Sequence, residues 1–366
     1  MTKASNDRLT SISRLLQGMG IPQEVIRFAK RPQRLSTAGL YDKQWESFTD
    51  HCKANNIEPF EATIGDIASY LLHKFNSGLQ PATIRVHRAA IASVLKHTNL
   101  DVSGNTIIND MLKRFDLERP RVKRTLPQFD IGLVLNQFLR PPFIDRQGSD
   151  LKIPLPMLAY KVSFLLALAS GSRASEIHAL SRESGRFKSD RTQEGRRTVT
   201  IHTHTGFLAK NARPSVIPPP LVIPSMAHLV GSKELERLWC PVRAIEVYMA
   251  RTPNGAYSVE DTRLLRHPDP TKRTTKGHIS LWIRNAITEA YTAAGSDPDS
   301  VHVRAHEVRA VAHSLVAYDG ATLQEILEGG RWRSSGSFFR HYLRDVSSSL
   351  ESASGPVVVA GRVIQH

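Results

Sequence analysis

The residues best suited to chemistry lie in the last quarter of the chain, where His306 and Arg309 are followed by Trp332 and Tyr342. Residues three apart on a helix are surface neighbours, so His306 and Arg309 are expected to face one anionic group. The arginine offers a planar fork of donors that suits phosphate, and the histidine can hold or pass a proton near neutral pH. Tyr342 adds a hydroxyl that can act as a nucleophile. The pattern indicates a site that attacks phosphodiesters.

Two other segments supply charges for such a reaction. Arg173 can join Arg309 as the second arm of a phosphate clamp, and Glu176 can fix the rotamer of Arg173. Taken alone, Arg173 and Glu176 are better explained as a surface salt bridge. Lys210, expected on a hairpin turn or the strand beyond it, can protonate the leaving oxygen as a general acid, although an exposed turn lysine is the more ordinary explanation.

Trp332 has two interpretations. Its indole N–H can donate to a phosphate, or its ring can brace the helix that carries Tyr342. His313 is four residues beyond Arg309 and is best explained as a core histidine. The sequence has no P-loop and no carboxylate cluster that suits two metals, so we expect a reaction without ATP, metal or another cofactor.

Composition favours a polyanionic partner. The 366 residues carry a formal charge of +15, and their number predicts two domains. Cys52 and Cys240 lack a metal-type spacing and are expected to be buried in a protein of a reducing compartment. The apolar stretch 153–170 is too short and interrupted for a membrane span, and no secretory signal is found. We therefore expect a nuclear or cytoplasmic protein that is neither secreted nor bound to a membrane.

The first part of the chain is predicted to be a helical DNA-binding domain over 36–115, after a loosely ordered arm, 1–35. Three apolar sets recur at helical spacing, the second of which stops at Gly78. On the third helix Arg85, Arg88 and Lys96 form a basic stripe that suits a DNA backbone or major groove, although a solvated face has the same pattern. The apolar sets are Tyr41, Trp45, Phe48 and Cys52; Ile64, Ile67, Leu71 and Phe75; and Ile84, Ile91 and Leu95.

A basic linker is predicted over 116–130. It includes Arg121, Lys123 and Arg124, which suit a strap across phosphates, while a solvated linker or a nuclear-import signal has the same composition.

The part beyond the linker is predicted to be a mainly helical domain, 131–350, with a small antiparallel sheet. Residues 197–205 alternate with β-branched types and form the clearest strand, with a second strand near 215–217. Thr322 and Glu325 form a capping box that opens a short helix. Residues 351–366 form an apolar tail that can dock into a neighbouring subunit or pack on its own. Helices are expected over 131–139, 157–169, 235–249 and 278–294.

The chemistry-bearing residues resemble a known catalytic set in type and order. Arg173 with Glu176, Lys210, His306 with Arg309, Trp332 and Tyr342 resemble those of the tyrosine recombinases, the phage-integrase-like enzymes. The blocks 163–180, 240–246 and 332–345 are similar to the branch carried by DIRS-type retrotransposons. The likeness extends over about residues 38–360, and Trp332 lies slightly further from Tyr342 than is usual in the family.

The resemblance implies a two-domain clamp around double-stranded DNA. Tyr342 is implied to attack the scissile phosphate, giving a 3′-phosphotyrosyl link and a free 5′-hydroxyl that attacks the partner strand. The family acts as a homotetramer that exchanges strands between two sites, here for integration of a mobile element.

Three alternatives remain at the level of sequence. A type IB topoisomerase uses the same chemistry, but the length and the N-terminal helical domain favour recombination. A catalytically inactive DNA-binding protein derived from a mobile element does not require Tyr342. A basic protein that coats nucleic acid does not explain Arg173, Arg309 and His306.

Overall fold

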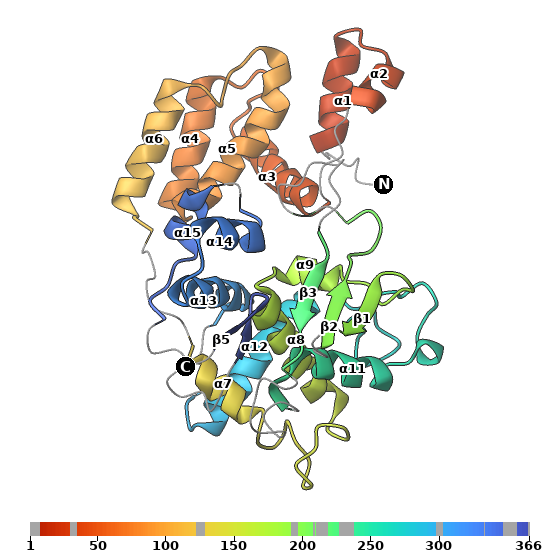
Figure 1. Cartoon of the computed structure of the whole chain (residues 1–366). Helices are drawn as coiled ribbons and strands as arrows, with labels where there is room; N and C mark the ends of the chain where they lie inside the picture. Colours follow the sequence, from red (N-terminus) through yellow and green to blue (C-terminus); the bar gives the residue numbers. More distant parts are fainter. Residues whose placement is uncertain are drawn as a thin grey trace. The chain divides into compact units, whose positions relative to one another are not determined.

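The computed structural model describes residues 8–29, 35–121, 129–191, 197–207, 209, 219–226, 238–297, 303–332, 334–346 and 357–364. The chain forms two compact units, Met1–Val122 and Lys123–His366 (Figure 1). Both units are mainly helical, and the strands of unit 2 are antiparallel. This agrees with the predicted fold class.

Unit 1 is helical throughout its described regular structure. The three predicted apolar sets lie on α3, α4 and α5 and, apart from Tyr41, meet in one core, to which α6 adds Ile108, Leu112 and Phe115. A capping box at Thr63 begins α4, and Pro81 lies in the first turn of α5. The helices are α1 (Arg8–Gly18), α2 (Gln23–Ala29), α3 (Leu35–Ala54), α4 (Ile64–Asn76), α5 (Pro81–Leu95), the 3₁₀ helix η1 (Lys96–Thr98) and α6 (Thr106–Glu118).

Helices α1 and α2 occupy a segment that was expected to be a loosely ordered arm. Arg8 is buried, and its guanidinium donates to Asp42 on α3 at 3.3 Å and to Ser93 on α5 at 3.1 Å. A buried arginine between two helices leaves no periodic apolar signal, so the sequence pattern did not reveal this anchor.

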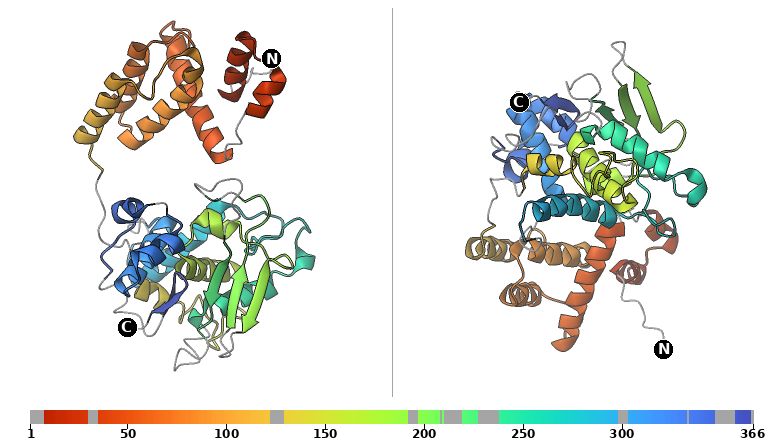
Figure 2. Two further views of the ribbon diagram at one scale, coloured as in Figure 1. Left: turned by 45° about the horizontal axis from the view of Figure 1, so that its top comes forward. Right: turned by 90° about the horizontal axis from the view of Figure 1, so that it is seen from below.

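Unit 2 is built around the predicted core helix α8 (Leu155–Ser170). Most of its residues are buried, as expected for a helix that is apolar on all sides. It packs against α11, α12 and α13 in the middle of the unit (Figure 2). The other helices in the described part of unit 2 are α7 (Ile131–Gln137), α9 (Ala174–His178), α11 (Pro241–Arg251), η2 (Asn254–Ala256), α12 (Lys276–Ala293), α13 (Ala305–Tyr318), α14 (Leu323–Gly330) and α15 (Ser335–His341).

One charged cluster is buried beside α8. Lys161 donates to Asp150 at 3.0 Å, and Arg243 donates to the same carboxylate at 2.9 Å. Burial raises the pKa of Asp150, but the charges and hydrogen bonds of Lys161 and Arg243 outweigh it and hold that pKa below its usual value. The cluster therefore stays ionised inside the unit.

A three-stranded antiparallel sheet has the order β1-β2-β3, with β1 (Phe187–Arg191), β2 (Arg197–Ile201) and β3 (Leu221–Pro224). Val199 lies opposite Ser189 on one side and Ile223 on the other. Strand β2 confirms the first part of the predicted strand 197–205. The expected strand near 215–217 lies outside the described residues, and β1 was missed because its polar sequence forms a mostly exposed edge.

The C-terminal strands β4 (Val357–Val359) and β5 (Arg362–Ile364) form a hairpin that packs on its own unit. Its turn donates from Ala360 N to Leu168 O at 3.0 Å and from Gly361 N to Ala169 O at 2.7 Å, at the end of α8. Docking of the tail into a neighbouring subunit stays a prediction.

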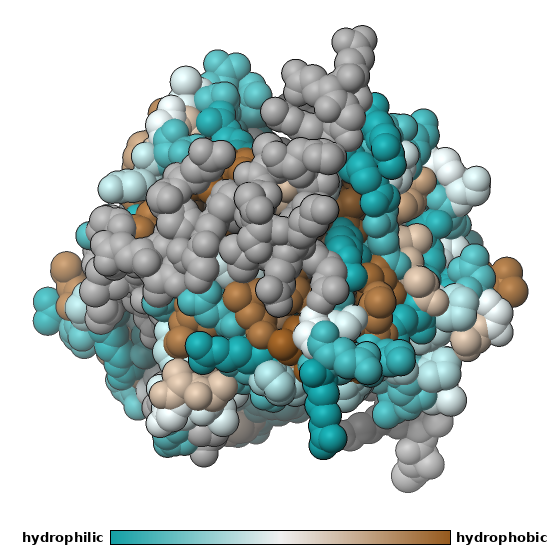
Figure 3. Space-filling view, turned by 60° about the horizontal axis from the view of Figure 1, so that its bottom comes forward, coloured by the Kyte–Doolittle hydropathy of each residue, from teal (hydrophilic) through white to brown (hydrophobic). Residues whose placement is uncertain are grey.

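Cys52 and Cys240 are both buried, as predicted from the sequence. On the face drawn in Figure 3, hydrophilic residues occupy most of the described surface, and apolar residues gather near its centre. Among the described helices, none is long and apolar enough to cross a membrane.

Candidate active site

The floor of the site is the sharp turn between α8 and α9. Gly171 ends α8 with a φ of +56°, and a Cβ there would lie 2.3 Å from the Cε1 atom of His313. This turn places Arg173 at the N-cap of α9. Glu176 accepts from the Arg173 backbone N–H at 2.8 Å and from its guanidinium at 3.1 Å. These two hydrogen bonds hold the Arg173 side chain at the N-terminus of α9.

Glu176 is buried, which overturns its interpretation as part of a surface salt bridge. Its carboxylate also lies 3.8 Å from Arg309 and 4.0 Å from Arg331. Burial raises the pKa of Glu176, but the hydrogen bond from the Arg173 backbone and the charges of Arg309, Arg173 and Arg331 more than offset it, so this pKa lies below its ordinary value. One ionised carboxylate therefore gathers three arginines.

Arg309 is buried on α13 and fixed from two sides. Its Nη1 donates to Gly171 O at 2.6 Å, and its Nη2 donates to Gly330 O at the end of α14. Burial and the charge of Arg173 lower the pKa of Arg309 to about 10, while Glu176 and the hydroxyl of Tyr342 act in the opposite direction. The guanidinium remains a cation at neutral pH because this pKa is still well above 7.

Trp332 lies at the centre of the site. Its ring centroid is 4.7 Å from those of His313 and Tyr342, and the Arg309 guanidinium carbon lies 4.7 Å from its ring. A Cβ on Gly330 would lie 2.2 Å from the indole, so this glycine admits the ring. These contacts support the bracing interpretation of Trp332. Its buried Nε1 and the Nε of Arg309 have no hydrogen-bond acceptor within the described parts of the chain.

Tyr342 follows α15 directly and meets the predicted partners. Its ring lies edge-on to that of His306 at 4.9 Å, and the Arg309 guanidinium lies 5.5 Å from its centre. His306 is exposed and Arg309 is buried, although they are neighbours on α13, so Tyr342 lies between solvent and core. The structure thus brings His306, Arg309, Trp332 and Tyr342 together.

The backbone around Tyr342 is tied to α13 by residues that the sequence did not single out. Ser314 Oγ lies 3.2 Å from Tyr342 O and accepts from Arg344 N at 2.9 Å. Arg344 forms a two-point ion pair with Glu307, with distances of 2.6 and 3.2 Å. In the sequence, the position of Glu307 next to His306 is the only indication that Glu307 belongs to the site.

His313 is a core histidine, as predicted. It is buried, and its Nδ1 lies 2.9 Å from Arg309 O. Burial, with the charge of Arg309, lowers its pKa to about 4, so the imidazole is neutral near pH 7. Its role is to fill the space between Gly171 and Trp332.

Arg331 is a third arginine of the site and was not predicted. It directly precedes Trp332 and ends α14 with a φ of +51°. Besides its approach to Glu176, it donates to Pro219 O at 3.2 Å. Lys210, the proposed general acid, lies outside the described residues.

The predicted DNA-binding residues that the structure describes divide into two kinds. Arg85 forms a two-point ion pair with Asp116 on α6, and Arg88 donates to Asn109 at 2.8 Å. These contacts hold α5 and α6 together. Lys96 and Arg121 are exposed, whereas 123 and 124 lie outside the described residues. Contact of any of these residues with DNA stays a prediction.

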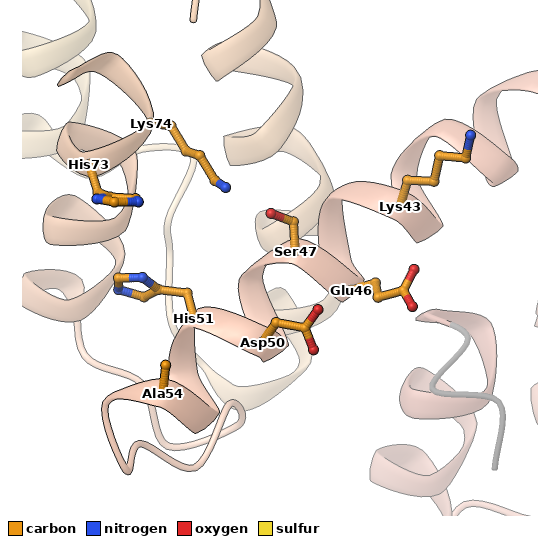
Figure 4. A pocket seen from close by; sticks show the side chains of 8 residues that line it. All are labelled: Lys43, Glu46, Ser47, Asp50, His51, Ala54, His73 and Lys74. Carbon is orange, nitrogen blue, oxygen red and sulfur yellow. The ribbon is translucent and has the colours of Figure 1, made fainter. Parts of the chain in front are cut away.

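A surface pocket of about 470 Å³ lies between α3 and α4 of unit 1. Figure 4 shows His51 and His73 facing each other there, with ring centroids 5.8 Å apart. Lys74, Lys43 and Asp50 also line the pocket, so charges of both signs are mixed. Within the described residues, no group of three or more His, Cys, Asp or Glu side chains is arranged to hold a metal ion.

No family model and no curated protein matches the chain, whereas several solved structures match it. The XerH site-specific recombinase, in a post-cleavage complex with a palindromic difH substrate, matches with a TM-score of 0.53 and 12% identity over 96% of this chain and 89% of that chain. The Tn1549 transposon integrase, in complex with transposon right end DNA, matches with a TM-score of 0.51 and 11% identity over 95% of each chain. The chain therefore has the two-domain fold of the tyrosine recombinases.

Proposed function

We propose that this protein is a site-specific DNA recombinase or integrase that cleaves and rejoins double-stranded DNA through a 3′-phosphotyrosyl link on Tyr342. One observation carries the proposal. The Tyr342 ring contacts His306, Trp332 and the guanidinium of Arg309, which shares the Glu176 carboxylate with Arg173. A hydroxyl nucleophile, a titratable imidazole and two cations at one place suit phosphoryl transfer.

In the proposed step, Tyr342 Oη bonds to the scissile phosphorus as the bond from phosphorus to the 5′ oxygen breaks. The phenolic proton passes to His306, whose ring adjoins Tyr342. The 5′ oxygen takes a proton from Lys210, the general acid that the sequence and the family resemblance both suggest. In the reverse step a 5′-hydroxyl gives its proton to Lys210 and bonds to the same phosphorus as the bond to Tyr342 Oη breaks, and His306 returns a proton to Tyr342. One phosphoester replaces another, so no external energy source is needed.

Two features of the site support stabilisation of the charge that develops on the phosphate. Arg309 is fixed by carbonyls and needs no reorganisation when the reaction occurs. Its Nε and Trp332 Nε1 are buried donors without an acceptor within the described residues, and phosphate oxygens are suitable acceptors. One such preorganised donor contributes about 3 to 4 kcal/mol to the transition state.

We also propose an oligomeric state, a biological role and a location. The protein acts as a homotetramer on DNA, serves integration of a mobile element of the DIRS-type branch, and works in the nucleus or cytoplasm. The formal charge of +15 supports a polyanionic partner.

A trapping assay tests the proposal without knowledge of the target sequence. The protein is incubated, without metal, with nicked duplexes whose central sequence is randomised, so that a cleaved strand diffuses away and the covalent adduct accumulates. Denaturing gels detect the adduct, mass spectrometry maps the modified residue, and sequencing of the attached DNA gives the site.

Tyr342→Phe is expected to abolish the adduct and to leave DNA affinity nearly unchanged. Tyr318→Phe is the matched control, because Tyr318 is an exposed tyrosine at the end of α13. An adduct that persists in Tyr342→Phe contradicts the assignment of the nucleophile. Relaxation of supercoiled DNA by isolated monomers, without strand exchange, would instead identify the topoisomerase alternative.

A further inference from the structure

Arg331 has a backbone conformation that its side chain disfavours. With a φ of +51° it lies in the left-handed region, where a Cβ crowds the carbonyl oxygen and glycine is the usual residue. Gly329 and Gly330 directly precede it, yet this position carries an arginine. A strained non-glycine residue within a site suggests that its side chain has a function there.

The Arg331 guanidinium lies beside that of Arg173. Nη1 of Arg173 is 3.1 Å and Nη1 of Arg331 is 4.0 Å from the same oxygen, Oε1 of Glu176. The Arg331 side chain is 25% exposed and that of Arg173 is 16% exposed, whereas Arg309 is 2% exposed. Arg331 and Arg173 therefore present the donors that a ligand can reach, whereas Arg309 is buried.

The charges around Glu176 do not balance. Three guanidinium groups face one ionised carboxylate, which leaves an excess of positive charge. Glu328 lines the same small hollow as Arg331, but its carboxylate accepts from Gln324 at 2.9 Å. Among the described residues, no ion pair joins Glu328 to Arg331. An anionic ligand would reduce this excess.

A hollow of about 190 Å³ adjoins the Arg331 side chain. It is bounded by the ends of α8 and α14, the start of β3 and the turn of the β4–β5 hairpin. Ser170 and Ser172 also line it. The Arg331 side chain thus has open space beside it, with a lining of polar and apolar residues.

We infer that Arg331 is a third phosphate-binding arginine, which donates to a non-bridging oxygen of the DNA phosphodiester that Arg173 holds. The inference rests on the proposed function and adds one residue, Arg331, to its substrate-binding site. An alternative without function is that Arg331 serves only to hold the carbonyl of Pro219. The two possibilities make opposite predictions for one substitution.

The decisive variant is Arg331→Gly. Glycine removes the guanidinium and relieves the left-handed strain, so the melting temperature is expected to stay unchanged or rise. The rate of adduct formation at saturating DNA is expected to fall at least tenfold, since preorganised donors to a reacting phosphate have effects of this size or larger. A stabilised but slower enzyme is the signature of a functional residue.

DNA affinity gives a second readout that does not require cleavage. In the Tyr342→Phe background, the slope of log Kd against log salt concentration is expected to decrease by about one unit when Arg331 is replaced by glycine, because one phosphate contact is lost. Arg331→Lys keeps a point charge and is expected to restore the slope but not the full rate. Arg284→Ala, at an exposed arginine on α12, controls for a general loss of charge.

The outcomes separate the two hypotheses. A wild-type protein that forms no Tyr342 adduct but binds DNA argues against the proposed function, while the salt slope still tests Arg331. If Arg331→Gly has the wild-type adduct rate and salt slope, the inference is overturned and the proposed function stands. A lower melting temperature with both DNA readouts unchanged assigns Arg331 to the Pro219 contact alone.

Discussion

The ion pair between Glu307 and Arg344 offers a test of how Tyr342 is positioned. It joins the first turn of α13 to the segment that follows Tyr342, and both side chains are less than one-tenth exposed. The substitution Glu307→Ala leaves the Arg344 guanidinium buried without this carboxylate. We expect a loss of stability and a displaced Tyr342.

The magnitude follows from burial. Removing one partner of a buried ion pair costs about 3 to 5 kcal/mol, and in a domain of this size each kcal/mol lowers Tm by about 2 to 4 °C. Glu307→Ala is therefore expected to lower Tm by about 10 °C. The double variant Glu307→Leu with Arg344→Met replaces both charges by apolar groups and is expected to recover most of this loss.

Thermal unfolding and the single-turnover rate of adduct formation are measured for both variants at a temperature where each is folded. The double variant is expected to be stable but to form the adduct slowly, because an apolar contact does not hold the segment after Tyr342 in one position. Two results refute this reasoning: a wild-type Tm for Glu307→Ala, or a wild-type adduct rate for the double variant.

Three other parts of unit 2 give further predictions. Gly171→Ala places a Cβ against His313 at a φ of +56° and is expected to destabilise the unit by about 2 to 4 kcal/mol and to abolish the adduct, because Gly171 O holds Arg309. Burial lowers the pKa of His313 from 6.5 to about 4, so between these values the unfolded chain binds a proton that the folded chain excludes. Urea unfolding should show full stability above pH 6.5 and a loss of about 3 kcal/mol by pH 4, and His313→Asn should flatten this profile. Asp150→Ala removes the carboxylate that faces Lys161 and is expected to cost about 3 to 5 kcal/mol in thermal unfolding, with an unchanged adduct rate in the remaining folded protein.

The grouping of the residues in the candidate site could be predicted because the proposed reaction restricts residue types. A phosphoryl transfer needs a nucleophile and cations, and the sequence offers Tyr342, Arg173 and Arg309 in segments with helical spacing. The apolar periodicity of α3, α4, α5 and α8 was also sufficient to place those helices. These are local signals, which a sequence carries directly.

Burial of charged residues could not be predicted in the same way. The spacing of Arg173 and Glu176 is that of a surface pair, and only α13 and α14, far along the chain, supply Arg309 and Arg331 to the same carboxylate. The basic stripe on α5 shows the same limitation, since Arg85 has its carboxylate partner on α6. Pairing between distant helices decides whether such a charge is available to a ligand.

Arg331 was missed for a different reason. Two glycines before it indicate the end of a helix, but they do not indicate that the left-handed residue is the arginine that follows them. The Glu307–Arg344 pair likewise links α13 to the segment after α15, and neither residue belongs to a periodic pattern.

The β4–β5 hairpin has a consequence for the order in which the candidate site is completed during synthesis. Its turn donates to the carbonyls of Leu168 and Ala169 in the last turn of α8, two residues before the glycine whose carbonyl holds Arg309. Residues near 360 thus complete the support of a site whose other parts begin near 170. A nascent chain that already carries Tyr342 still lacks this support, so the candidate site is complete only after almost the whole of unit 2 has folded. The arginines around Tyr342 gain their full support only when this late hairpin has formed.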